Sequence, residues 1–182
     1  MKRFTPVIAA ALLLAMLPLG NAQAVPVTHN LALNAGETKT WDGTAAPGAN
    51  ANYNGAVPPL GPERTCSADI QTKCEYALVA LTNPVPEEDA DGKLTKTATF
   101  TLDNYSLPSP ASDFALTIYD TDKDGAVRGE ELGTSDNSDV PDPDEQVTIS
   151  VQTTRLVSTK YYLVEVAYFT SLNASYKGTV KF

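Results

Sequence analysis

The stretch DFALTIYDTDKDGAVRGEE (residues 113–131) contains the two patterns that decide how this chain folds. It begins with Phe114, Leu116 and Ile118 at alternate positions, which is the apolar period of a half-buried β-strand. It continues into DTDKDG (residues 120–125), in which three aspartates alternate with other residues and end at a glycine. The stretch therefore predicts a strand that leads directly into an acidic turn.

The acidic turn has the ligand spacing of a calcium loop. With Asp120 as position 1, Asp122 is at 3, Asp124 at 5, Gly125 at 6 and Glu131 at 12, the register of the twelve-residue loop. Calcium takes about 6–8 hard oxygen ligands, and a glycine at position 6 permits the sharp turn around the ion. We predict that Asp120, Asp122, Asp124 and Glu131 bind Ca²⁺, the last only if the loop wraps as it does between helices.

The segments on either side of this loop differ from those of an EF-hand. A strand enters where a helix would, and the residues from Leu132 to Ser135 have no helical character. The alternative is a solvated hairpin in which the Asp-Gly pair only turns the chain. A second acidic segment would supply further ligands if the two loops met, although an exposed acidic loop is the simpler interpretation; its acids are Asp136, Asp139, Asp142 and Asp144.

The N-terminus resembles a secretory signal peptide. Lys2 and Arg3 precede an apolar run over residues 6–20, and Ala22-Gln-Ala24 fits a cleavage site with small residues. The run is shorter than the roughly 20 residues that a membrane-spanning helix needs. We therefore expect residues 1–24 to be removed, no membrane insertion, and a secreted chain over residues 25–182, extracellular or periplasmic.

The charge of the chain favours some partners over others. The formal net charge is −9 at pH 7, and it becomes more negative once the two N-terminal bases are removed. Binding to nucleic acid needs clustered lysine and arginine, so we expect no nucleic-acid partner. A divalent cation is the partner that this charge suggests, and solubility is the simpler explanation.

The few cysteines and histidines restrict the chemistry. Cys66 and Cys74 are the two cysteines of a chain predicted to be exported, and they predict one disulfide bond. His29 is the one histidine, so catalytic sets and zinc sites built on histidine and cysteine are not expected. A pair of carboxylates for glycan hydrolysis stays open, and a small secreted glycan-active enzyme is the alternative to a non-catalytic protein.

The rest of the chain predicts an all-β protein. Alternation places Ala98, Phe100 and Leu102 on one face of a strand and Thr97, Thr99 and Thr101 on the other; Val147, Ile149 and Val151 alternate in the same way. Residues 42–65 have no apolar period and predict a long surface loop. About seven or eight short strands predict one antiparallel β-sandwich over residues 25–182; we expect strands at residues 31–41, 74–81, 97–102, 114–119, 146–151, 161–169 and 176–182.

The order of the motifs DFALTIYD, LGTSDNSD, DEQVTI, YYLVEVAYF and NASYKGTVKF resembles the bacterial pre-peptidase C-terminal domain, over about residues 96–182. This resemblance implies a jelly-roll-like sandwich that is not itself catalytic. Related modules bind polymers such as collagen or polysaccharide, and some carry structural calcium. We expect two departures from the family: a module that stands without a preceding catalytic domain, and a turn, DTDKDG, that is longer than the usual one. We therefore expect a secreted, non-catalytic module that binds an extracellular polysaccharide or protein surface and holds Ca²⁺.

Overall fold

The computed structural model describes residues 27–44, 74–83, 94–104, 113–125, 129–136, 145–154, 156–170 and 175–182. In these residues the chain forms nine β-strands and no helix, which confirms the predicted all-β class. No helix that is long and apolar enough to cross a membrane occurs in this part of the chain. The predicted signal peptide and most of the predicted loop over residues 42–65 lie outside the described residues.

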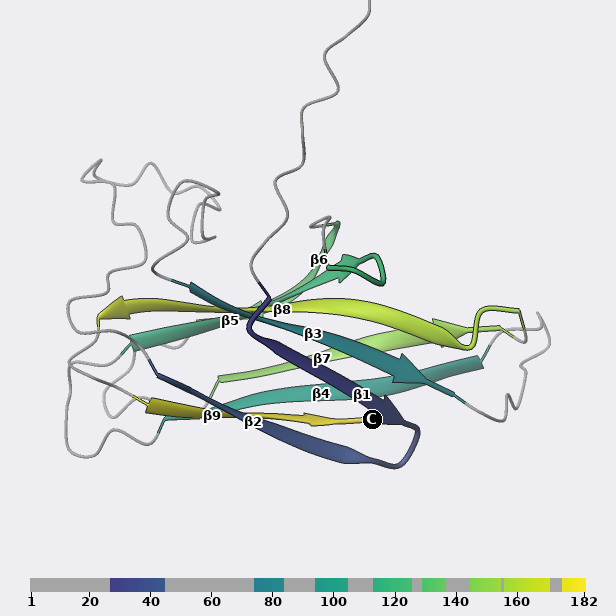
Figure 1. The fold of residues 1–182 in the computed structure, drawn as a ribbon, viewed down its shortest axis with the longest axis horizontal. Helices are drawn as coiled ribbons and strands as arrows, with labels where there is room; N and C mark the ends of the chain where they lie inside the picture. Colours follow the sequence, from purple (N-terminus) through teal and green to yellow (C-terminus); the bar gives the residue numbers. More distant parts are fainter. Residues whose placement is uncertain are drawn as a thin grey trace, which may run out of the picture.

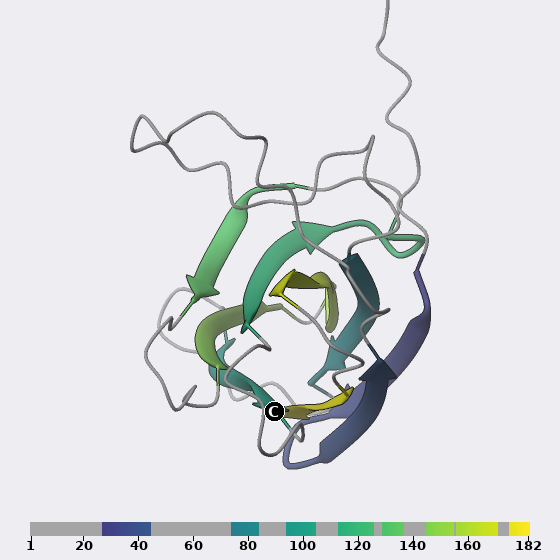
Figure 2. The same cartoon turned by 90° about the vertical axis from the view of Figure 1, so that its left-hand side faces the viewer.

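The strands form two sheets that face each other (Figure 1). The five-stranded sheet has the order β1 (His29–Asn34), β3 (Cys74–Thr82), β8 (Thr159–Thr170), β5 (Asp113–Thr121) and β6 (Glu131–Ser135). The four-stranded sheet has the order β2 (Thr38–Thr44), β9 (Ser175–Lys181), β4 (Leu94–Asn104) and β7 (Glu145–Thr153). Seen end-on in Figure 2, β1 and β2 lie side by side along one edge of the two layers.

The four-stranded sheet has one buried and one exposed face. On β7 the burial alternates along the whole strand, with Val147, Ile149 and Val151 in the core between the sheets. On β4, Ala98 and Phe100 are fully buried in the same core. Both strands therefore confirm the faces predicted from their sequences.

The middle of the five-stranded sheet is buried on both faces. On β5 every residue from Phe114 to Tyr119 is buried, and on β8 every residue from Tyr162 to Ala167 is buried. One face of these strands contributes to the core between the sheets. The outer face carries a second cluster, against which Val27 packs; it consists of Cys74, Tyr76, Ala115, Tyr119, Leu163 and Ala167. Near-continuous apolar runs are typical of strands buried on both sides.

The prediction of one strand over residues 31–41 is wrong, because a turn divides it into β1 and β2. Gly36 adopts a positive φ of 91° that other residues rarely accept. The Glu37 N–H donates to the Asn34 carbonyl at 3.0 Å, and the Glu37 carboxylate accepts from the Asn34 N–H at 2.8 Å. Leu33 and Trp41 are both buried, but they belong to opposite sheets.

The antiparallel prediction is wrong for one pair of strands. β1 runs parallel to β3, with His29 opposite Ala77 and Asn34 opposite Thr82. Parallel neighbours need a long connection, and the chain between them passes through β2 in the other sheet. The short strand β6 was not predicted, since its sequence ELGTS has no apolar alternation.

Two aromatic residues lie over glycines on the neighbouring strands β2 and β9. Trp41 on β2 is opposite Gly178 on β9, and Tyr176 on β9 is opposite Gly43 on β2. A Cβ atom at Gly178 would overlap the indole of Trp41, and one at Gly43 would overlap the ring of Tyr176. These glycines are therefore required for the two large rings to fit between the sheets.

We expect Gly178→Ala to destabilise the protein by about 1–3 kcal/mol, the usual cost of overpacking a core. The added methyl would force Trp41 out of its position in the core. Urea unfolding measures the loss. Thr179→Ala is the matched control on the same strand, because Thr179 points outward and is half-buried; an equal loss in both variants would contradict the packing argument.

Candidate functional site

The acidic turn joins β5 to β6 and is closed at its base by backbone hydrogen bonds. The Asp120 N–H donates to the Glu130 carbonyl at 2.9 Å, and the Gly129 N–H donates to the Asp120 carbonyl at 2.8 Å. The register between the two strands shifts between Ile118 and Tyr119, which marks a β-bulge. The loop therefore extends from the end of a paired hairpin.

The turn has a defined conformation from Asp122 to Gly125. The Gly125 N–H donates to the Asp122 carbonyl at 3.1 Å, and the Asp124 N–H donates to Asp122 Oδ1 at 3.1 Å. Gly125 has a φ of 66°, in the left-handed region that glycine adopts without strain. Asp122 thus organises the turn with both its carbonyl and its carboxylate, as aspartates do in Asx turns.

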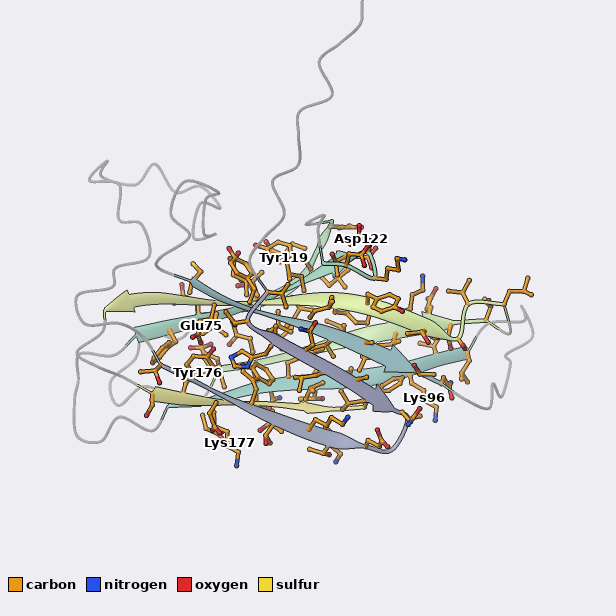
Figure 3. All side chains as sticks on the ribbon, viewed as in Figure 1. Glu75, Lys96, Tyr119, Asp122, Tyr176 and Lys177 are labelled. Atoms are coloured by element: carbon orange, nitrogen blue, oxygen red, sulfur yellow. The ribbon has the colours of Figure 1, made fainter. Side chains whose placement is uncertain are left out.

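The turn folds back over the outer face of the five-stranded sheet. Gly125 is buried, and a Cβ atom there would lie 3.1 Å from Val27 Cγ2 and 3.5 Å from Leu78 Cδ1. Leu78 belongs to β3, which is separated from β5 by β8, so the turn reaches across β8. Figure 3 shows Asp122 outside this sheet, on the same side as Tyr119.

The four predicted calcium ligands are all exposed, and the first and last of them point to opposite faces of the sheet. Asp120 is opposite Tyr162, whose side chain lies in the core between the sheets. Glu131 is opposite Tyr119, whose side chain lies in the outer cluster. Because opposite residues on paired strands point to the same face, Asp120 and Glu131 point to opposite faces. The loop does not wrap Glu131 toward Asp120 as an EF-hand loop would.

The acidic side chains do not gather around one point in the described residues. There, no group of three or more histidine, cysteine, aspartate or glutamate side chains could hold a metal ion. Asp136 follows β6, whereas Asp139, Asp142 and Asp144 lie outside the described residues. The calcium site stays a prediction from the sequence.

Tyr162 is influenced by the acidic turn. Burial of its hydroxyl raises its pKa to about 12, and the negative charge of Asp120 acts in the same direction. Tyr162 is only 4% exposed. Removal of the negative charge of Asp120 should therefore lower the pKa of the buried Tyr162.

A row of polar side chains crosses the outer face of the five-stranded sheet. Glu165 on β8 is 1% exposed and lies opposite Tyr76 on β3 and Thr117 on β5. The Thr117 and Thr134 hydroxyls are hydrogen bonded at 3.0 Å. This row was not predicted from the sequence, although one glutamate inside the apolar segment YYLVEVAYF was a usable signal.

Two further glutamates link the two sheets from inside. The Tyr176 hydroxyl on β9 donates to the Glu75 carboxylate on β3, and both lie between the layers in Figure 3. The Ser135 hydroxyl at the end of β6 donates to the Glu145 carboxylate on β7. Each bond joins one sheet to the other. This arrangement assigns these carboxylates a structural role.

The remaining predicted residues lie at strand ends. Cys74 is the first residue of β3, is 8% exposed and belongs to the outer cluster. Cys66 lies outside the described residues, so the Cys66–Cys74 disulfide stays a prediction. His29 begins β1 and is half-buried.

No protein-family model matches the chain, and no curated protein matches its sequence. The resemblance to the pre-peptidase C-terminal domain therefore stays a prediction.

We expect Gly125→Ala to destabilise the protein more than Gly36→Ala. Both glycines have positive φ, which costs a residue with a side chain about 1–2 kcal/mol, but only Gly125 has neighbours that a methyl would press against. Gly36→Ala thus measures the backbone cost alone. Thermal or urea unfolding compares them, and equal losses would show that the packing of the turn on Val27 contributes nothing.

We expect Tyr162 to make the protein sensitive to alkali. The unfolded tyrosine loses its proton near pH 10, whereas folded Tyr162 keeps it to about 12, so its contribution to stability is lost as pH rises through this window. Urea midpoints between about pH 9 and pH 12 should fall less steeply in Tyr162→Phe than in the wild type. Tyr161→Phe is the control, and parallel curves for wild type and Tyr162→Phe would refute the assignment.

Proposed function

We propose that this protein is a non-catalytic β-sandwich module that works outside the cytoplasm, carries structural Ca²⁺ at its acidic turn, and binds an extracellular polysaccharide or protein surface. The observation that carries the calcium assignment is the conformation of Gly125. It occupies the sixth position of the loop, has a φ of 66° and is buried against Val27 and Leu78. The calcium loop needs a glycine at this position for its sharp turn.

The charges of the turn support the same assignment. Asp120, Asp122 and Asp124 lie within five residues, all with exposed side chains, and their negative charges repel one another. A divalent cation would relieve this repulsion and join the turn more firmly to β5. Asp120 and Glu131 face opposite sides of the sheet, so both can bind one ion only if the loop rearranges. Glu131, at the last position of the loop, is proposed as the weaker ligand of the two.

The order of the strands supports a jelly-roll topology. From β2 to β9, each connection leads from a strand of one sheet to a strand of the other sheet, with one exception. The exception is the connection from β5 to β6, which stays within the five-stranded sheet. The resulting orders, β2-β9-β4-β7 and β3-β8-β5-β6, are those expected of an eight-strand jelly roll, to which β1 is added at an edge. This topology also agrees with the family resemblance of the sequence.

Three of the described glutamates occupy places that do not form a catalytic pair. Glu75 and Glu145 accept hydroxyl hydrogen bonds between the two sheets, and Glu165 is buried on the outer face. A pair of carboxylates for glycan hydrolysis needs a substrate between them, about 5–10 Å apart in the usual mechanisms. Glu75 and Glu145 are instead engaged with hydroxyl groups between the sheets, and Glu165 is 1% exposed on the outer face.

Calcium should bind the chelator-treated protein and raise its melting temperature. A site that binds only the folded state adds about 2.7 kcal/mol of stability at a calcium concentration one hundred times the dissociation constant. Titration calorimetry and thermal unfolding with and without Ca²⁺ measure both effects.

Three variants test the ligands. Asp122→Asn combined with Asp124→Asn should weaken binding strongly, Glu131→Gln should weaken it less, and Asp103→Asn on the four-stranded sheet should leave it unchanged. Absence of both heat and a melting shift in the wild type would refute the calcium proposal.

A further inference from the structure

The outer face of the four-stranded sheet is a regular array of hydroxyl groups. On β4 the outward positions are all threonine from Thr95 to Thr101, and on β7 they are glutamine, threonine and serine. Successive outward residues of a strand are about 6.8 Å apart, and neighbouring strands are about 4.8 Å apart. The array therefore repeats in two directions.

The outward side chains also line up across the strands, and most of them carry a hydroxyl group. One row is Thr40, Thr179, Thr101 and Gln146, and the next is Thr38, Lys181, Thr99 and Thr148. Each row extends over about 14 Å, three strand spacings. The Thr99 and Thr148 hydroxyls lie 3.2 Å apart. We call the outward residues of β2, β9, β4 and β7 the hydroxyl face.

The composition of the hydroxyl face argues against a protein partner. Its outward positions in the described strands carry no apolar or aromatic side chain. The energetic centre of a protein interface is usually built from tryptophan, tyrosine or arginine, surrounded by apolar contacts. This face has no such centre in the part of the chain that the structure describes.

The charges of the hydroxyl face argue against a charged polymer. Lys177 lies opposite Asp42 on one side and Asp103 on the other, and Figure 3 shows Lys177 outside the four-stranded sheet. With Lys181, the described outward positions hold two lysines and two aspartates, so their formal charges cancel. The chain as a whole has a net charge of −9, so this face is neutral within an acidic protein. An uncharged partner matches it best.

We propose that the hydroxyl face binds an uncharged polysaccharide whose chain lies across the strands. The proposal rests on the polymer-binding function proposed above and specifies its face and ligand class. Threonine, serine and glutamine side chains each donate and accept hydrogen bonds, as sugar hydroxyls do. One such hydrogen bond replaces hydrogen bonds to water, so by itself it contributes little to the free energy of binding. A polymer with a repeating unit can form many of these bonds with a face that also repeats.

The test uses a pair of substitutions that keep side-chain shape. Thr101→Val combined with Thr179→Val removes two neighbouring hydroxyls of one row and leaves the strands intact. Thr134→Val is the control: it removes a hydroxyl from an exposed residue of β6 in the other sheet, where the hydroxyl is hydrogen bonded to Thr117. Melting temperatures establish that all three proteins are folded.

Retention on insoluble cellulose, chitin and starch, and on a polyanionic polysaccharide, is measured at low and high salt. We expect the wild type and Thr134→Val to be retained equally on at least one uncharged polymer, in a salt-independent way. The double variant should partition onto that polymer about tenfold less, as expected for the loss of two hydrogen bonds.

Three other results would overturn the proposal. If the wild type binds an uncharged polymer and the double variant binds equally, the hydroxyl face is not the site, and the polymer-binding function itself survives. If the wild type binds only the polyanion at low salt, or only an immobilised matrix protein, the ligand class is wrong. If it binds none of these surfaces, the polymer-binding function fails as well, whatever the outcome of the calcium titration.

Discussion

The burial of the five-stranded sheet on both faces is the constraint on which the rest of this structure depends. Its central strands β3, β8 and β5 carry apolar side chains toward the core and toward the outer cluster. The outer cluster must be kept from water, and the acidic turn contributes by placing Gly125 against Val27 and Leu78. A turn that looks like a solvent-exposed calcium loop in the sequence is therefore part of the packing of the sheet.

The four-stranded sheet meets a different requirement, because it is buried on one face only. Its inner face packs Trp41 and Tyr176 over glycines, and its outer face carries threonine and other polar residues. The two sheets are joined by hydroxyl–carboxylate hydrogen bonds, from Tyr176 to Glu75 and from Ser135 to Glu145. Buried carboxylates are costly unless they accept hydrogen bonds, so these contacts fix which residues meet across the core.

The sequence predicted the strands whose pattern is local and missed those that depend on the neighbouring sheet. The alternation of β4 and β7 was visible, because every second residue is apolar. The break between β1 and β2 was missed, since Leu33 and Trp41 fit the alternation of one strand equally well. The strand β6 was missed because it is short and its side chains are largely exposed; it exists through its pairing with β5.

The sequence by itself determined that the chain is all-β, which faces of its alternating strands are apolar, and that an acidic turn follows β5. These properties follow from the alternation of apolar and polar residues and from the types of residue in the turns, both of which are visible within a few consecutive residues. Only the tertiary structure decided that Asp120 and Glu131 point to opposite faces and that Glu165 is buried. The side of a sheet that a residue faces depends on strand pairing and a bulge, and its burial depends on distant segments, so spacing along the chain does not specify either.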